Sequence, residues 1–185
     1  MILTRLIALL QSGSENRETF FARIVLFFPI LDPRYLAIER AYNAAKDAFR
    51  EIKREGGQRY FEHLRAVALI LIVHLRVKNH NIIIAALLHD VLEKTAADPA
   101  GIKAAFGKDV LGIVREVTDD RNLPDPERKQ RQIESARRLS TAAKKIRLAD
   151  KICNMRDIMT YPLGWSRQRK LAYLAFAGKL AAELR

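Results

Sequence analysis

The chain has 185 residues, which suits a single domain, and 49% of them are hydrophobic, which is enough for a core. Glycine and proline are sparse, at 8 and 6 residues, and apolar positions recur with a period near 3.6, so we expect an all-α fold. One cysteine, Cys153, excludes an intramolecular disulfide and a thiolate metal cluster, and it fits a reducing compartment.

The chain is strongly basic, with 33 Lys and Arg against 21 Asp and Glu and a net charge of +12. Such a field attracts nucleic acid, a phosphate-rich small molecule or a membrane surface, or it serves only solubility. We find no signature of a nucleic-acid-binding motif. The apolar runs are too short to span about 30 Å of hydrocarbon, and a clear signal-peptide cleavage site is missing. We therefore expect a cytoplasmic protein that binds neither nucleic acid nor membrane.

Residues 1–34 are predicted to form an N-terminal helical extension. A short amphipathic helix precedes a polar break at Ser12 to Asn16, and an aromatic-rich helix then ends at Pro29 and Pro33. The apolar faces of these helices must be covered. Two alternatives stay open: the extension packs on the domain, or it forms a contact in a homodimer.

Residues 35–185 are predicted to form the main domain, as a bundle of helices. Asp32 is the expected N-cap of the first, with Pro33 at its first position. Gly56 and Gly57 interrupt the chain before the next helix. The helices are predicted over residues 35–51, 58–75, 82–94, 99–106, 108–117, 127–139, 141–159 and 167–184.

Two imidazoles and two carboxylates offer the ligands of a divalent metal. His89 and Asp90 are adjacent near the end of an apolar helix, His63 starts the preceding helix, and Asp150 lies in a later one. One ion bound by all four residues would connect three helices. The alternative without a metal is a histidine at a helix end paired with a surface aspartate. Ligands without sulfur suit manganese, iron, magnesium with water, or zinc. A site with open positions can assist phosphoester hydrolysis.

Helical spacing places two further side chains near these donors, because residues four apart share a face. Glu93 is four residues after His89, and Asn154 is four residues after Asp150. The other two histidines, His74 and His80, are expected to be a buried core residue and a loop residue.

The chain from residue 35 to 185 resembles the HD-domain phosphohydrolases, and within them the RelA/SpoT-type alarmone hydrolases. It is most similar to the single-domain branch of small alarmone hydrolases, which includes the metazoan SpoT homologue. The segments that carry the resemblance keep their order and spacing, and they are AYNAAKDAF, REGGQRYFEHLRAVA, IIIAALLHDVLEKT, FGKDVLGIVREVTDDRNLP, ERK, IRLADKICNMRD and GWS.

The resemblance implies an HD-domain helical bundle that holds Mn²⁺ or another divalent metal. The family's metal ligands fall on the four residues already selected, and Asn154 matches a motif asparagine. Arg54 matches an arginine that meets the nucleotide, and Tyr60, Lys144 and Arg147 are further candidates for substrate binding. The implied reaction removes pyrophosphate from the 3′ position of guanosine tetra- or pentaphosphate, with Glu93 as the group that orients or deprotonates water.

The chain departs from the family inside the catalytic motif, where Lys94 replaces the usual aspartate after Glu93. Two charges about 6 Å apart interact by roughly 3 kcal/mol at an effective dielectric constant near 20. Replacing an aspartate by a lysine is therefore enough to alter water activation and substrate placement. Three consequences stay open: Lys94 impairs hydrolysis, it holds a phosphate of a different substrate, or it points to solvent.

Three functions follow from these observations. The first is the alarmone pyrophosphohydrolase, with a phosphorylated guanine nucleotide as its partner. The second keeps the metal but acts on another phosphorylated nucleotide. The third is a nucleotide-binding module in which Lys94 has weakened hydrolysis.

Overall fold

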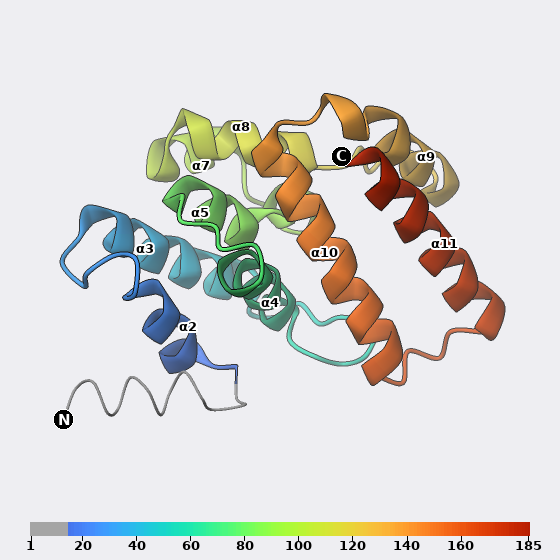
Figure 1. Ribbon diagram of the computed structural model, residues 1–185, viewed down its shortest axis with the longest axis horizontal. Coiled ribbons are helices and arrows are strands. Elements are labelled where there is room, and N and C mark those ends of the chain that lie inside the picture. The colour runs from blue at the N-terminus through green and yellow to red at the C-terminus, as the bar shows by residue number, and fades with distance from the viewer. Residues whose placement is uncertain (1–14) are drawn as a thin grey trace.

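A computed structural model describes residues 15–185, and these form the predicted all-α fold (Figure 1). The predicted first amphipathic helix lies outside the described residues. Within the described range, a single isolated β-bridge pairs Lys53 with Arg59. The helices are α2 (Arg17–Ile24), α3 (Pro33–Ala48), α4 (Tyr60–Val73), α5 (His80–Leu88), α6 (Val91–Lys94), α7 (Pro99–Phe106), α8 (Lys108–Val117), α9 (Asp125–Ser135), η1 (Ala136–Arg138), α10 (Thr141–Thr160) and α11 (Arg167–Glu183).

Short polar side chains begin several of these helices. The Asp32 carboxylate accepts a hydrogen bond from the Arg34 backbone N–H, and Pro33 occupies the first helical position, as predicted. Ser140 and Ser166 cap α10 and α11 in the same way. Each cap satisfies a backbone donor that the helix leaves unpaired.

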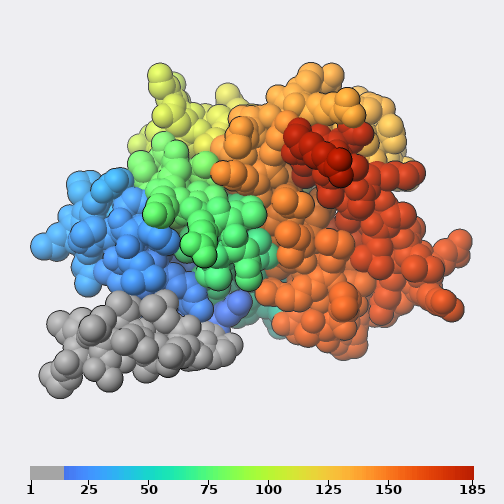
Figure 2. Space-filling view, viewed as in Figure 1, coloured from blue at the N-terminus to red at the C-terminus, as the bar shows by residue number. Residues whose placement is uncertain are grey.

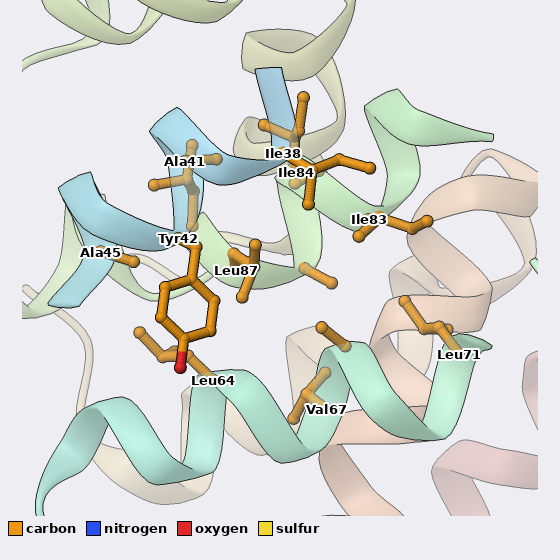
Figure 3. Close-up of a cluster of buried hydrophobic side chains, with 14 of the residues drawn as sticks. Ile38, Ala41, Tyr42, Ala45, Leu64, Val67, Leu71, Ile83, Ile84 and Leu87 are labelled. Atoms are coloured by element: carbon orange, nitrogen blue, oxygen red, sulfur yellow. The ribbon is translucent and has the colours of Figure 1, made fainter. Parts of the chain in front are cut away.

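The main core lies where α3, α4 and α5 pack together. Figure 3 shows Tyr42 of α3, Leu64 and Val67 of α4 and Leu87 of α5 pointing into the same buried space. Helix α4 also packs against α10, so its apolar side chains meet neighbours on more than one side. Full burial of one large apolar side chain contributes about 1.5–3 kcal/mol, so this core is the main source of stability.

The described part of the predicted extension, residues 15–34, packs on this core. Phe20 and Phe21 of α2 lie with their ring centroids 5.1 and 5.2 Å from that of Tyr42. Figure 1 shows α2 (blue) beside α3 and α4. The domain boundary after residue 34 stays a prediction.

The predicted helix over residues 82–94 is interrupted. Helix α5 ends at Leu88 and α6 begins at Val91, because Asp90 adopts φ −99° and ψ 0°, in the bridge region of backbone space. The predictions for the other two histidines were wrong, since His74 caps the end of α4 and is exposed, and His80 is the first residue of α5. Helix α9 begins at Asp125, two residues earlier than predicted.

A second, smaller apolar cluster joins α9, η1 and α11. Its buried members are Ala136, Phe176 and Leu180, and they are separate from the main core. Helix α10 lies between the two regions, with α5 and α4 on one side and α11 on the other (Figure 2). Among the described residues, no helix has the length and apolar character needed to cross a bilayer.

Candidate metal centre

The four predicted donors meet beside the main core. His63 lies in the first turn of α4, His89 and Asp90 lie at the break between α5 and α6, and Asp150 lies in α10. The His63 Nε2 atom is 3.2 Å from Asp150 Oδ1, and His89 Nε2 is 3.3 Å from Asp90 Oδ2. Each Nε2 atom is 4.0 Å from the other carboxylate. Three helical segments therefore converge on one point.

The two imidazoles present their Nε2 atoms to this point. His89 Nδ1 is 2.8 Å from the Ala86 carbonyl oxygen, to which it donates, so Nε2 is the nitrogen left to hold a proton or a metal ion. His63 Nδ1 is 3.3 Å from the Cys153 Sγ atom. Among the described residues, neither Nε2 atom has a hydrogen-bond partner, although both are buried. Buried polar atoms without partners are rare, so these two call for a cation between them and the carboxylates.

The charges around the imidazoles favour a cation at this point. Burial opposes a charged imidazole, yet the carboxylates of Asp90 and Asp150 raise the pKa of His89 to about 9. Burial lowers the pKa of His63. A divalent ion could take the place of the proton on His89, because the same two carboxylates would stabilise either positive charge. The donor set therefore fits a divalent metal.

Neighbouring side chains orient the two carboxylates. The Tyr60 hydroxyl donates to Asp90 Oδ2 at 2.6 Å, and the Asn154 amide donates to Asp150 Oδ1 at 2.7 Å. The Lys151 ammonium is 2.9 Å from Asp150 Oδ2. Burial alone would favour the neutral acid, but Lys151 helps to hold the pKa of Asp150 well below its usual value. Asp150 is therefore ionised and able to bind a cation at neutral pH.

The centre opens into a cleft of about 380 Å³. Of the remaining predicted residues, Lys144 alone does not line it, and its Nζ atom donates instead to the Arg185 carbonyl oxygen at 3.1 Å. Lys144 was predicted to bind substrate beside the metal donors, including Asp150. Six residues turn a helix by about 600°, which leaves the two side chains about 120° apart. The predicted residues that do line the cleft are Arg54, Tyr60, Glu93, Lys94, Arg147 and Asn154.

The two lining arginines that were predicted from the sequence already have protein partners. Arg54 donates to the Asn154 amide oxygen, and its Nε atom is 3.2 Å from Asp157 Oδ2. Arg147 pairs with the Asp119 carboxylate at 2.5 Å. Arg54 is therefore joined to a neighbour of the metal donors, and Arg147 is joined to the segment between α8 and α9.

Glu93 and Lys94 are adjacent but differ in environment. Glu93 is buried, and its Oε1 atom accepts a hydrogen bond from the Asp119 backbone N–H at 2.5 Å. Burial, helped by the nearby charge of Asp90, raises the pKa of Glu93 to about 7. Lys94 is exposed and lines the cleft, and its side-chain ammonium has no hydrogen bond or ion pair with residues 15–185. The cleft therefore carries an acid–base group beside an unpaired ammonium.

Several cleft residues were not singled out from the sequence. Lys151 follows a predicted ligand directly, and Asp119 lies within the FGKDVLGIVREVTDDRNLP segment of the resemblance, whereas Gln132 carries no local mark of its position. Trp165, which also lines the cleft, lies within the GWS segment that helped to define the resemblance. Tyr173 and Phe176 add to this aromatic wall from α11.

Comparison with known proteins agrees with this geometry. The family model described as HD domain matches residues 41–179. A Drosophila melanogaster relative, guanosine-3′,5′-bis(diphosphate) 3′-pyrophosphohydrolase MESH1, is 44% identical over 127 residues, covering 68% of this chain and 71% of its own length. The MESH1 of Xenopus tropicalis is 39% identical over 151 residues, covering 80% and 84%.

A solved structure is similar as well. It belongs to a metazoan orthologue of SpoT described as hydrolysing ppGpp, with a TM-score of 0.78 and 39% identity. The match covers 80% of this chain and 85% of that one. The fold, the His and Asp donor set and these matches agree, and the chain belongs to the HD-domain family.

Proposed function

We propose that this protein is a metal-dependent pyrophosphohydrolase that removes the 3′-diphosphate of guanosine tetra- or pentaphosphate. The observation that carries the proposal is the pair of buried Nε2 atoms of His63 and His89, which make no hydrogen bond among the described residues and face two carboxylates beside Glu93. The activity named for the relatives supports the choice of substrate.

His63, His89, Asp90 and Asp150 would hold the metal, and we propose Mn²⁺. The mixed nitrogen and oxygen donors suit this ion. When bound, a divalent ion lowers the pKa of a water molecule and polarises a phosphoryl oxygen. Asn154 and Tyr60 keep the two carboxylates in place, because each donates a hydrogen bond to one of them.

Glu93 is the proposed general base. Its carboxylate lies in the cleft, and a pKa of about 7 lets it exchange a proton with water near neutral pH. Cationic side chains on the cleft walls are proposed to bind the phosphates of the nucleotide. They include Lys53 and Arg54 before α4 and Arg128 and Lys129 on α9.

The test is pyrophosphate release from guanosine tetraphosphate by the purified protein, with Mn²⁺ and without it, alongside metal analysis. Turnover that depends on the metal and falls about 10²- to 10⁴-fold in Glu93→Gln supports the proposal. Glu127→Gln, an exposed change on α9, is the matched control. A metal-loaded protein that leaves guanosine tetraphosphate intact would overturn the proposal.

Lys94 supports a second candidate, in which the substrate is another phosphorylated nucleotide. Its exposed ammonium lines the cleft without a partner among residues 15–185, so it can meet a phosphate. A panel of nucleotides decides this, with release of phosphate rather than pyrophosphate as the supporting result. Nucleotide binding without turnover, restored to turnover by Lys94→Asp, would instead indicate a weakened hydrolase.

We also propose that the protein acts in the cytoplasm, without nucleic acid or membrane as a partner. A homodimer remains a proposal, supported by the exposed apolar side chains of Leu26, Ile30 and Leu31. Light scattering coupled to size-exclusion chromatography tests it, and a monomer at micromolar concentration would refute it.

A further inference from the structure

The Glu93 carboxylate is held at one oxygen by the backbone of a distant segment. Glu93 Oε1 accepts from the Asp119 N–H, and Asp119 lies after α8, in the stretch that leads to α9. The Glu93 Oε2 atom makes no hydrogen bond with residues 15–185, and it is not among the buried atoms that lack a partner. One oxygen is therefore fixed, and the other is free to face the cleft.

The side chain of Asp119 is itself held from two helices. Its Oδ1 atom accepts from Arg147 of α10 at 2.5 Å, and its Oδ2 atom accepts from the Gln132 amide of α9. Gln132 and Arg147 are 9% and 8% exposed, so both bonds lie mostly out of water. Because each carboxylate oxygen has a donor on a different helix, the carboxylate cannot turn without losing a bond. This fixes the direction of the Asp119 N–H.

The orientation of the Gln132 amide follows from chemistry. Asp119 is an acceptor, so the amide must present its NH₂ group there and its Oε1 atom elsewhere. Oε1 is buried and has no donor among the described residues. A buried acceptor without a donor is unfavourable, and a residue that only anchored α9 would not need it. The position is therefore typical of a side chain kept for a functional reason.

We infer that Gln132 is a positioning residue for the proposed hydrolysis: through the Asp119 carboxylate it fixes the backbone N–H that holds Glu93 in the cleft. This inference rests on the proposed function for the role of Glu93. Arg147, predicted to bind substrate, donates the other hydrogen bond that holds the Asp119 carboxylate. Arg128 and Lys129 lie one turn before Gln132 on the cleft side of α9, so α9 links the phosphate-facing cations to Glu93.

The test substitutes Gln132→Met, which keeps the length of the side chain and removes the donor. A misplacement of about 1 Å in a reacting group can cost up to 10²-fold, so we expect kcat to fall about 10- to 100-fold while KM changes little. In a Glu93→Gln background the same substitution should change kcat less than about twofold, since its effect passes through Glu93. Gln130→Met, on the exposed side of α9, is the matched control.

Equal losses of kcat in both backgrounds, or no loss in either, would overturn the inference. Hydrogen exchange at the Asp119 amide gives a readout that needs no substrate: exchange should quicken in Gln132→Met and stay unchanged in Gln130→Met. Inactivity of the unaltered protein toward guanosine tetraphosphate would reject the proposed function, whereas unchanged Asp119 exchange would reject the Gln132 linkage. If Gln132→Met does not fold, Asp119→Asn weakens the same two bonds and should lower kcat in the same way.

Discussion

The main core and the cluster of α9, η1 and α11 contribute differently to the cleft. The first buries a continuous set of large side chains from α2, α3, α4, α5, α8 and α10, and its helices carry or directly flank all four candidate metal donors. The second buries only Ala136, Phe176 and Leu180, yet its helices supply much of the opposite wall of the cleft. The candidate metal centre and the proposed substrate-binding wall therefore depend on regions that bury very different amounts of apolar side chain.

The two regions therefore have different roles: one holds the candidate metal donors, and the other forms the opposite wall of the cleft. Donors that must stay within about 0.5 Å of a working geometry lie on, or directly beside, helices fixed by extensive burial. The opposite wall is held by a few apolar contacts and by polar links such as the hydrogen bond from Trp165 to Glu55. Regions with few buried contacts open at lower free energy than the core does. We therefore expect the wall to move while the donors stay in place.

The largest effect is expected at a donor. Asp150→Ala removes a carboxylate from the centre, and we expect metal retention and turnover to fall by more than about 100-fold, beyond the usual effect of an outer-shell change. Atomic absorption and pyrophosphate release measure both. Asp109→Ala, an exposed carboxylate on α8, is the control and should leave both unchanged. Full metal content in Asp150→Ala would remove this residue from the ligand set.

The next effect compares the two regions directly. Leu87→Ala empties a fully buried position, and we expect the free energy of unfolding to fall by about 2–5 kcal/mol. Phe176→Ala should instead leave the global transition nearly unchanged and speed amide exchange in α11. Chemical denaturation and hydrogen exchange measure these changes. Equal losses in the global transition would show that the two regions unfold as one unit.

A smaller effect is expected where a neighbour orients a donor. Tyr60→Phe removes the hydroxyl that donates to Asp90 and keeps the ring stacked on Phe49, so metal affinity should fall about 10- to 100-fold. Titration with Mn²⁺ measures it. Tyr161→Phe, at the more exposed end of α10, is the control. An unchanged affinity in Tyr60→Phe would mean that the core alone sets the direction of Asp90.

The smallest effect is expected at an ion pair within the wall. Arg137 and Glu183 join η1 to α11, but the Arg137 side chain is 77% exposed. Exposed pairs contribute about 0–1 kcal/mol, so Arg137→Ala should barely change thermal unfolding or α11 exchange. A large increase in α11 exchange would show that polar links, rather than the Phe176 cluster, hold the wall.

Much of the fold could be predicted because its signals are local. The two helices on either side of Gly107 were expected over 99–106 and 108–117, as observed, and a cap and a proline identified the start of α3. The four donors could be chosen from ligand chemistry alone. Whether these donors come together depends on how the helices pack. The apolar periodicity predicts the helices but does not specify how they pack.

Other features depend on contacts that no local pattern records. The stretch around His89 contains neither glycine nor proline, so no local residue pattern predicts the break in the helix at Asp90. That break lets the carboxylate meet Tyr60, which belongs to another helix. Likewise, no local pattern predicts that Gln132 and Asp119 lie near Glu93, because only the packing of three helices brings these residues together. The choice of Lys144 is a different case, because helical angles alone place its side chain about 120° from that of Asp150.

The order of the donors along the chain has a consequence for biosynthesis. His63, His89 and Asp90 leave the ribosome early, whereas Asp150 follows only after most of the domain has been made. Domains generally fold as units during synthesis, so a nascent chain can complete its binding site only once α10 has emerged and docked. Capture of the ion would then mark a nearly complete HD domain, and a product that stops before α10 would be left without it.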